Sequence, residues 1–304
     1  MKSFIYKSFA VAISIAASVV TGFSQTRSVE HDLSPFEAIE ASNGFKVTVS
    51  RSDLYGVKLT IDDALESYVD CYVKAGVLYL SLDEKKVPKD VKKQYKGRNS
   101  GDPTLVAVVY MPVLKSLTLN DESEFYNSGN LSGDSFSLSM TGNSKTSDLK
   151  IVSKTVSVTI GKNARLANAN VSAEGDFTFS ADGKSTAVVT CAAENLNLNI
   201  SGSSEINLSA DIEKKTAITT AGSSKASVSG NSNELSITGK SISSKIDASL
   251  FKVSSAVLST TGTTADIAPE KSLELDLGKG TEISYSGDPA VKIVKIQNAT
   301  VTRR

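Results

Sequence analysis

The sequence predicts an all-β protein that folds as a right-handed parallel β-helix, a β-solenoid with about twenty residues per coil. The first observation is a Gly-Ser phrase that recurs at about this interval between Ser139 and Tyr285. Its clearest copies are Ile200–Ser204, Thr220–Ser224 and Thr260–Thr264. The second observation is that the segments on both sides of the phrase alternate apolar and polar residues, which is the pattern of a half-buried strand.

The third observation is that the apolar positions of these segments align from one copy to the next. One column contains Ile206, Ala226 and Ile246, and another contains Val188, Leu208, Val228 and Ala248. A repeat of two strands cannot bury an apolar face by itself. Successive copies are therefore expected to stack, with each strand pairing in parallel with its counterpart one coil away.

The Gly-Ser phrases are interpreted as corners between strands, because glycine readily adopts the positive φ that a tight corner can require. Two polar columns then lie at the corners, and we expect their hydroxyls to bond to backbone groups and to one another. A hydroxyl-lined binding strip is the alternative interpretation. The columns are Ser203, Ser223, Ser243 and Thr263, and Ser204, Ser224, Ser244 and Thr264.

The N-terminal segment, residues 1–24, is predicted to be a secretory signal peptide. Lys2 and Lys7 come before an apolar run from Phe9 to Val20, and small residues follow it. The run is shorter than the roughly 20 residues that span a bilayer, and no later segment is apolar enough to do so. We therefore expect an exported protein, periplasmic or extracellular and at the cell surface, with no transmembrane segment after the signal is removed.

The rest of the chain is divided into an N-terminal part, residues 25–120, and a repetitive part, residues 121–304, which form one continuous domain. The first part is expected to supply β-rich coils and a cap, beginning with a frayed polar leader that contains a solvated His31. A basic loop at 85–101 interrupts it. The second part is expected to end in a strand at 291–296 and a C-terminal cap. The strands of the first part are predicted at 45–49, 57–61, 68–73, 77–82, 104–110 and 114–119.

Charge and composition narrow the range of partners. The chain has 33 basic and 33 acidic residues, which gives no electrostatic footprint for nucleic acid. The basic loop is expected to be a mobile, solvated excursion, and binding of acidic polysaccharide or membrane headgroups is the alternative. Tryptophan is absent and aromatic residues make up only 6% of the chain, so few rigid faces are available for a carbohydrate platform.

Two cysteines, Cys71 and Cys191, lie far apart in the sequence. Each alternates in phase with neighbouring valines, so both are expected to be small core residues. A disulfide between them stays open at this point, because a sequence does not show the close approach that the bond requires.

Catalytic chemistry is not expected. The chain contains no phosphate-binding loop, zinc motif or serine nucleophile elbow. Lyases and glycosidases need carboxylates or a cation cluster in one groove, whereas the acids of the repeat occupy different phases of the coil. We predict no enzyme and no catalytic, cofactor-binding or metal-ligating residue, leave the binding residues unassigned, and expect Glu205 to form an exposed ion pair with Lys225. The scattered acids are Asp148, Asp176, Asp182, Glu205, Asp247, Asp266 and Glu282.

Five segments occur in a characteristic order along the chain. They are Phe36-x-x-Ile39, Asn43–Val49, Gly76-x-Leu78-x-Leu80, Val109–Leu117 and Ile283–Pro289. Together with the repeat, this order resembles the family described as putative auto-transporter adhesin, head GIN domain. The resemblance implies a secreted right-handed β-helix from Gram-negative envelopes, adhesin-like and without established catalytic residues. The chain departs from the family at Asn120–Ser123, where a Ser-Gly pair is frequent, and in lacking a glycine-rich ending.

These observations lead to one functional expectation and two alternatives. The chain is expected to be a secreted adhesin-like solenoid that binds a surface ligand, with polysaccharide as a candidate, through extended strand faces. The alternatives are a carbohydrate-active enzyme of lyase or glycosidase type on the same fold, and a purely structural envelope protein. The arrangement of acids from neighbouring coils discriminates between the first two. The oligomeric state is not predicted.

Overall fold

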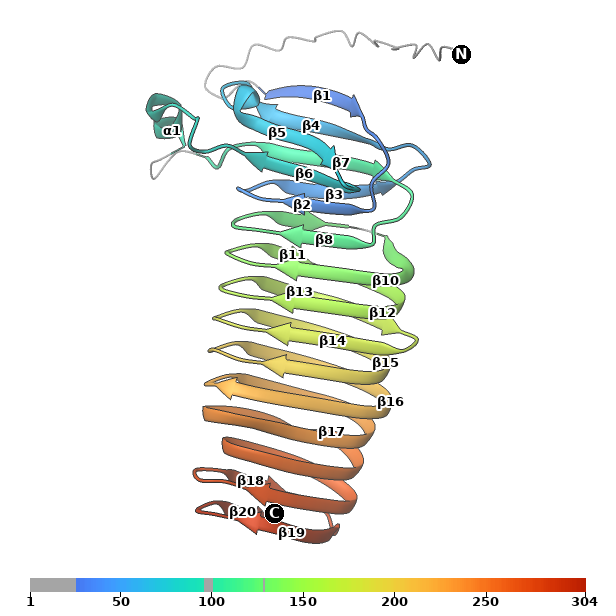
Figure 1. The fold of residues 1–304 in the computed structure, drawn as a ribbon, viewed down its shortest axis with the longest axis vertical. Helices are drawn as coiled ribbons and strands as arrows, with labels where there is room; N and C mark the ends of the chain where they lie inside the picture. Colours follow the sequence, from blue (N-terminus) through green and yellow to red (C-terminus); the bar gives the residue numbers. More distant parts are fainter. Residues whose placement is uncertain (1–25, 96–100, 128) are drawn as a thin grey trace.

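The computed structural model describes residues 26–95, 101–127 and 129–304, so the expected signal peptide lies outside the described residues. The fold is an all-β solenoid of about nine stacked turns, spaced about 20 residues apart, as the sequence predicts. Figure 1 shows the coils as a tall stack with a wider head at the N-terminal end. Within the described residues, no helix has the length and apolar character needed to cross a bilayer.

The head, residues 26–111, contains seven strands and two short helices. These are β1 (Thr26–Asp32), β2 (Ala38–Ala41), β3 (Lys46–Arg51), β4 (Gly56–Asp62), η1 (Glu66–Tyr68), β5 (Val69–Lys74), β6 (Val77–Leu82), α1 (Lys89–Gln94) and β7 (Leu105–Met111).

The coils follow the head. Their strands are β8 (Ser116–Leu119), β9 (Glu124–Tyr126), β10 (Asn130–Met140), β11 (Lys145–Ser147), β12 (Lys150–Ile160), β13 (Arg165–Ala173), β14 (Asp176–Ala181), β15 (Thr186–Ile200), β16 (Glu205–Gly222), β17 (Lys225–Leu277), β18 (Glu282–Tyr285), β19 (Ala290–Ile296) and β20 (Thr300–Arg303).

Parallel pairing between successive coils aligns their apolar residues into one continuous core. On the sheet that includes β8 and β14, Phe136 pairs with Val156, Val156 with Phe177 and Phe177 with Leu196. All four side chains are almost completely buried, at 0–3% exposure. The alternating pattern of the sequence therefore marks the inward positions correctly, because a half-buried strand turns every second side chain to the core.

One predicted column is wrong by a single residue. Val189, not Val188, pairs with Leu208, and Val188 pairs with Asn207 and is 45% exposed. The pairing of Val189 with Leu208 spans 19 residues instead of 20, because coil length varies where β-bulges shift the register. A fixed repeat of twenty therefore places Val188 on the wrong side of its strand.

The serine column at the inner side of the corner forms the expected ladder. Ser204, Ser224 and Ser244 are at most 1% exposed, and the Oγ atoms of Ser224 and Ser244 lie 3.1 Å apart. Ser204 Oγ donates to the carbonyl of Ser201 at 2.8 Å, which closes the corner onto its own backbone. The last copy in this column departs from the prediction, because Thr263 is buried at this place whereas Thr264 is only half-buried.

The head contains antiparallel strand pairs, a feature that the predicted β-rich coils and cap did not specify. Strand β4 pairs antiparallel with β1 and β7, and β5 pairs antiparallel with β6. The turn between β5 and β6 explains the hairpin, because Ala75 and Gly76 have φ values of +51° and +76°. Positive φ at both central residues is typical of the tight turn that joins antiparallel strands.

The leader and the basic loop also differ from expectation. The leader is not frayed, because all of β1 pairs with β4, although the side chain of His31 is exposed as predicted. The basic segment contains the helix α1, which begins after Pro88 and projects from the head (Figure 1). Residues 96–100 of this segment lie outside the described residues.

The C-terminal end contains two strands in the part predicted to form a cap, and the cap itself stays a prediction. The strand expected at 291–296 is present as β19, and β20 follows it and pairs with β18. Every side chain of β19 is exposed, and no described segment lies beyond β19 and β20 (Figure 1).

Candidate functional site: the hydroxyl face

Fourteen outward positions on the sheet that includes β8 and β14 form a surface that we call the hydroxyl face. Parallel registers place these residues in two rows that run across successive coils. The first row is Ser116, Ser137, Ser157, Thr178, Asn197, Ala217 and Ser236, and the second is Thr118, Ser139, Thr159, Ser180, Asn199, Thr219 and Thr238. All but Ala217 carry a hydroxyl or an amide.

The geometry of the hydroxyl face is regular. Neighbouring strands of a sheet lie about 4.8 Å apart, and residues of the same face are about 6.7 Å apart along a strand, so the rows form a flat grid of polar groups. Side chains of adjacent coils contact each other: Asn199 Nδ2 donates to Ser180 Oγ at 3.4 Å, and the hydroxyls of Thr219 and Thr238 are also 3.4 Å apart. These contacts hold the side chains in register from coil to coil.

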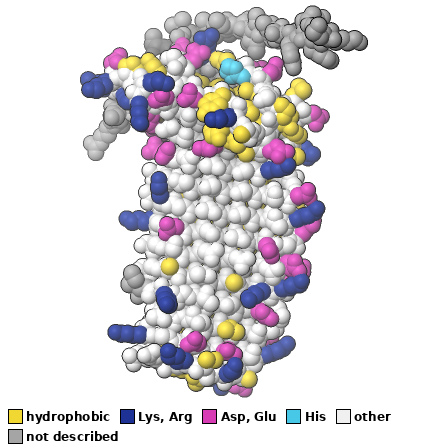
Figure 2. All heavy atoms as spheres, in the orientation of Figure 1, with side chains coloured by type: hydrophobic (Ala, Val, Ile, Leu, Met, Phe, Trp, Pro, Cys, Tyr) yellow, Lys and Arg dark blue, Asp and Glu magenta, His cyan; other side chains and the backbone are white. Residues whose placement is uncertain are grey.

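The hydroxyl face carries no charge at its fourteen positions, whereas another face of the same coils does. There, Lys145, Arg165, Thr186, Glu205 and Lys225 form one outward row. Figure 2 shows the same contrast, because the middle of the solenoid is nearly free of charged side chains and the charges lie along its two sides. The hydroxyl face is therefore suited to a neutral, hydroxyl-rich partner more than to an ionic one.

Two shallow depressions interrupt this side of the solenoid. The first, of about 180 Å³, lies over Thr159, Ser180, Asn199 and Thr219 in the second row. Its volume is below the roughly 300 Å³ at which pockets for small ligands begin. At these coils the hydroxyl face therefore offers an extended surface and not a pocket.

The second depression, of about 430 Å³, lies nearer the C-terminal end and is lined in part by Lys215, Glu234, Glu274 and Lys292. Glu234 and Glu274 were not singled out by the sequence analysis, because they come from coils whose spacing is not twenty residues. Lys292 Nζ lies 2.9 Å from Glu274 Oε2, so this carboxylate is held in an ion pair.

Five of the seven acids that the sequence analysis singled out are engaged in local contacts. Each carboxylate below accepts a hydrogen bond or forms an ion pair, and within the described residues no group of three or more potential metal ligands occurs. The contacts are Asp148 with Asn168 at 3.4 Å, Asp176 with Asn195 at 2.9 Å, Asp182 with Ser201 at 2.8 Å, Asp247 with Ser249 at 2.7 Å and Asp266 with Arg304 at 2.7 Å.

The expected ion pair between Glu205 and Lys225 is not formed. These residues are partners in the parallel register of β16 and β17, but their charged atoms make no ion pair within the described part of the chain. The side chains of two exposed register partners remain free to separate, because an exposed ion pair gains little free energy and costs side-chain entropy.

Both cysteines are free, as their apolar phase suggested. Burial raises the pKa of the Cys71 thiol to about 11. Burial, and secondarily the Asp211 carboxylate, raises the pKa of the Cys191 thiol to about 12. Neither thiol is therefore a nucleophile at neutral pH, since the thiolate is the reactive form.

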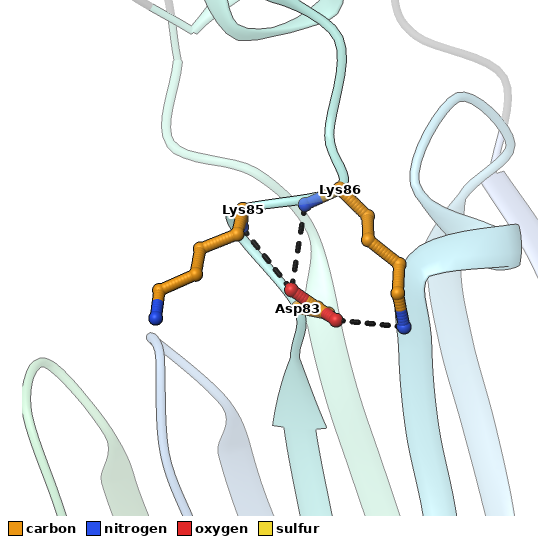
Figure 3. Close-up of polar contacts among 3 residues, drawn as sticks. All are labelled: Asp83, Lys85 and Lys86. Atoms are coloured by element: carbon orange, nitrogen blue, oxygen red, sulfur yellow. Dashed lines mark hydrogen bonds and ion pairs between the residues drawn. The ribbon is translucent and has the colours of Figure 1, made fainter.

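The basic segment is partly neutralised where it leaves β6. Asp83 accepts the backbone N–H groups of Lys85 and Lys86 at 3.2 and 3.4 Å, and its second oxygen lies 2.8 Å from Lys86 Nζ (Figure 3). The side-chain bond from Lys86 holds the pKa of Asp83 below its usual value. Lys85 points away from this carboxylate and stays available to solvent (Figure 3).

An aromatic pair lies at the head end of the sheet that carries the hydroxyl face. Tyr72 stacks on Tyr79 with ring centroids 5.1 Å apart and an angle of 19° between the planes. The registers connect Tyr79 to Glu40 and Glu40 to Thr118, so the pair continues the second row. The sequence analysis considered only the overall content of aromatic residues and therefore did not identify this pair. The two rings meet because β5 pairs with β6.

A stacked parallel solenoid of this kind defines a protein of the β-helix class. The chain belongs to the family described as "Putative auto-transporter adhesin, head GIN domain", whose family model matches residues 35–210 and 165–289. A search of functionally curated proteins found no match.

Several solved structures resemble this chain. A putative adhesin from Parabacteroides distasonis is 19% identical, covers 92% of this chain and 98% of its own, and has a TM-score of 0.51. A putative adhesin from Parabacteroides merdae is 18% identical, with coverages of 92% and 96% and a TM-score of 0.49. A putative lipid binding protein from Parabacteroides distasonis is 16% identical, with the same coverages and a TM-score of 0.48.

Proposed function

We propose that this chain is an exported, adhesin-like solenoid that binds a polysaccharide at a cell or matrix surface through the hydroxyl face. One observation carries the proposal: the fourteen positions of this face are neutral, small and in register over seven successive coils. Membership of the adhesin family supports an adhesin-like role and a place at the cell surface or outside the cytoplasm.

The physical argument is that repeating surfaces match repeating polymers. Each Ser, Thr or Asn offers one or two weak hydrogen bonds that water also makes, so a single contact contributes little net free energy. A polymer that engages several coils forms later contacts intramolecularly, and the apparent affinity then greatly exceeds that of any one contact. The stacked Tyr72 and Tyr79 supply an apolar surface against which a sugar ring packs at the head end.

Binding of a polysaccharide to the hydroxyl face does not require that the polymer be cleaved. Five of the seven acids that the sequence singled out are held in local contacts, and the depression lined by Glu234 and Glu274 lies at one end of the hydroxyl face instead of along it. We therefore propose a non-enzymatic role, with the signal segment directing export and an adhesin role requiring the outer side of the envelope.

The test is a pair of matched lysine substitutions. Asn199→Lys places a long charged side chain in the hydroxyl face, whereas Asn207→Lys makes the same change at an exposed position on another face. Against an immobilised panel of neutral polysaccharides, Asn199→Lys is expected to weaken binding about tenfold, equivalent to about 1.4 kcal/mol. Asn207→Lys should bind as the unmodified protein does.

Three results would contradict the proposal. Equal loss in both variants would place the binding surface elsewhere. Release of shortened products from any polysaccharide would make the chain an enzyme. The absence of binding to all neutral polysaccharides would favour a purely structural role in the envelope.

A further inference from the structure

The C-terminal end of the solenoid exposes an apolar strand. On β19, the side chains of Val291, Ile293, Val294 and Ile296 are between 41% and 60% exposed. Large exposed apolar residues occur elsewhere in the described chain, but not four within one short strand. Such a cluster on a protein surface marks an interaction site.

The register explains why these residues are apolar. Val291 pairs with Leu273, Ile293 with Leu275 and Ile296 with Leu277, and each of these leucines is completely buried. The strand β19 therefore continues three core columns, but the coil that would cover it is missing from the described chain. Its outer backbone edge is also unpaired, and such an edge readily pairs with another strand.

The head end has different chemistry. Its outermost strand, β1, reads Thr-Arg-Ser-Val-Glu-His-Asp, and all of its side chains are exposed except Val29, which is half-buried. Charged residues on an edge strand oppose strand addition. The edge strand β1 therefore offers no apolar counterpart to β19, whereas the C-terminal end of a second copy does.

The charges at this end are largely compensated within one chain. Lys292 forms an ion pair with Glu274 at 2.9 Å, Arg303 with Asp288 at 2.9 Å and Arg304 with Asp266 at 2.7 Å. Among the described residues, Lys295 is the cation of β19 without an ion pair. Two such ends can therefore approach without strong repulsion, because most of their positive charge is already neutralised.

We infer that this end binds the same end of a second copy of the chain, and that two solenoids join tail to tail about a twofold axis. Strand β19 of each copy then pairs antiparallel with its equivalent, and Ile293, the middle residue of β19, lies on the axis. The apolar columns of both copies become buried and both free edges become paired. This inference goes beyond the proposed function, and a dimer would present two hydroxyl faces to one polymer.

The experiment is sedimentation of the purified protein over a range of concentrations, with two matched variants. The unmodified protein is expected to sediment with twice the chain mass. Ile293→Lys, at a position that is 60% exposed, should raise the dissociation constant at least about tenfold. Leu250→Lys, at a position that is 77% exposed and lies outside β19, should leave the dimer intact.

A crosslink checks the geometry independently of stability. Ile293→Cys should form an intermolecular disulfide on mild oxidation, because the two copies of residue 293 meet at the axis, whereas Leu250→Cys should not. A protein that stays monomeric at high concentration would overturn the inference, as would a dimer that Ile293→Lys leaves unchanged or that crosslinks equally well through both cysteines. Polysaccharide binding is measured separately, so failure here leaves the proposed function untouched.

Discussion

At the residue scale, the stack depends on backbone conformations at its corners that few residues adopt. Gly202 has a φ of +66°, and Gly222, one coil further on, has a φ of +71°. A Cβ at Gly202 would lie 2.7 Å from the backbone N of Gly183 and 2.8 Å from its carbonyl oxygen. Corners of adjacent coils therefore pack backbone against backbone. The looser copy at 160–163 differs, because Lys162 has the positive φ there and not Gly161.

Replacing Gly202 by alanine is expected to destabilise the protein. The left-handed conformation costs a residue with a Cβ about 1 kcal/mol, and relieving the backbone clash adds to this, for a total of about 2–4 kcal/mol. The measurement is the midpoint of urea unfolding. Gly161→Ala is the matched control and should change the midpoint little, because a Cβ there meets nothing within 4 Å. Equal midpoints for the two variants would show that the corners are not tightly packed.

At the scale of elements, the corner serine ladder links successive coils through the interior. Ser224 Oγ is within hydrogen-bonding distance of Ser244 Oγ at 3.1 Å and of the carbonyl of Ala221 at 3.2 Å. Its neighbour Ser223 belongs to the other predicted column, which contains Ser203, Ser223, Ser243 and Thr263, and its side chain is exposed. The two columns therefore have different roles, although they look alike in the sequence.

The difference between these two columns can be measured. Ser224→Ala removes a buried hydroxyl and leaves Ser244 with one partner fewer, so a loss of about 1–2 kcal/mol in the free energy of unfolding is expected. Ser223→Ala should cost less than about 0.5 kcal/mol, because surface changes away from special contacts are usually that small. If both variants unfold at the same urea concentration, the ladder does not contribute to stability.

The length of the connection between two strands also decides whether they pair parallel or antiparallel. The strands β5 and β6 are separated only by Ala75 and Gly76, which is too short a connection for a parallel crossover. A two-residue connection of this kind was visible in the sequence and could have predicted the hairpin. The antiparallel pairing of β1 with β4 could not be predicted in this way, because the two strands are separated by a long stretch of chain.

At the scale of the whole molecule, one hydrophobic core runs from the head to the last coil. Because cysteine thiols are buried in this core, the folding stability depends on pH. The thiol of an unfolded cysteine has a pKa near 9.0, whereas burial raises that of Cys191 to about 12. Between these values the unfolded chain releases a proton that the folded chain keeps. Folding stability is thus fully present below about pH 9 and falls as the pH rises toward 12.

A steep loss of stability at alkaline pH is therefore expected, and Cys191→Ala should make it shallower. The measurement is the urea midpoint at pH 8 and at pH 10.5 for both proteins. Other groups titrate in the same range, so the informative quantity is the difference between the two slopes. Parallel slopes would mean that the Cys191 thiol does not contribute.

Some properties of this protein follow from the sequence alone. The Gly-Ser period, the alternation of apolar residues and the corner serines predict a parallel solenoid, because each depends on residues within one or two coils. Such local and strictly repeated patterns have few other folded solutions. The core phase of Cys191 was predictable for the same reason.

Other properties depend on tertiary structure. The sequence predicts which side chains point outward, but only the registers between coils assemble them into the two rows of the hydroxyl face. β-Bulges that shorten a coil place Val188 at the surface, and a prediction that assumes a constant repeat length cannot include such bulges. In the sequence, β19 has the same apolar pattern as a buried strand, yet all of its side chains are exposed. Burial depends on whether a further coil covers a strand, and the sequence of the strand itself does not show this.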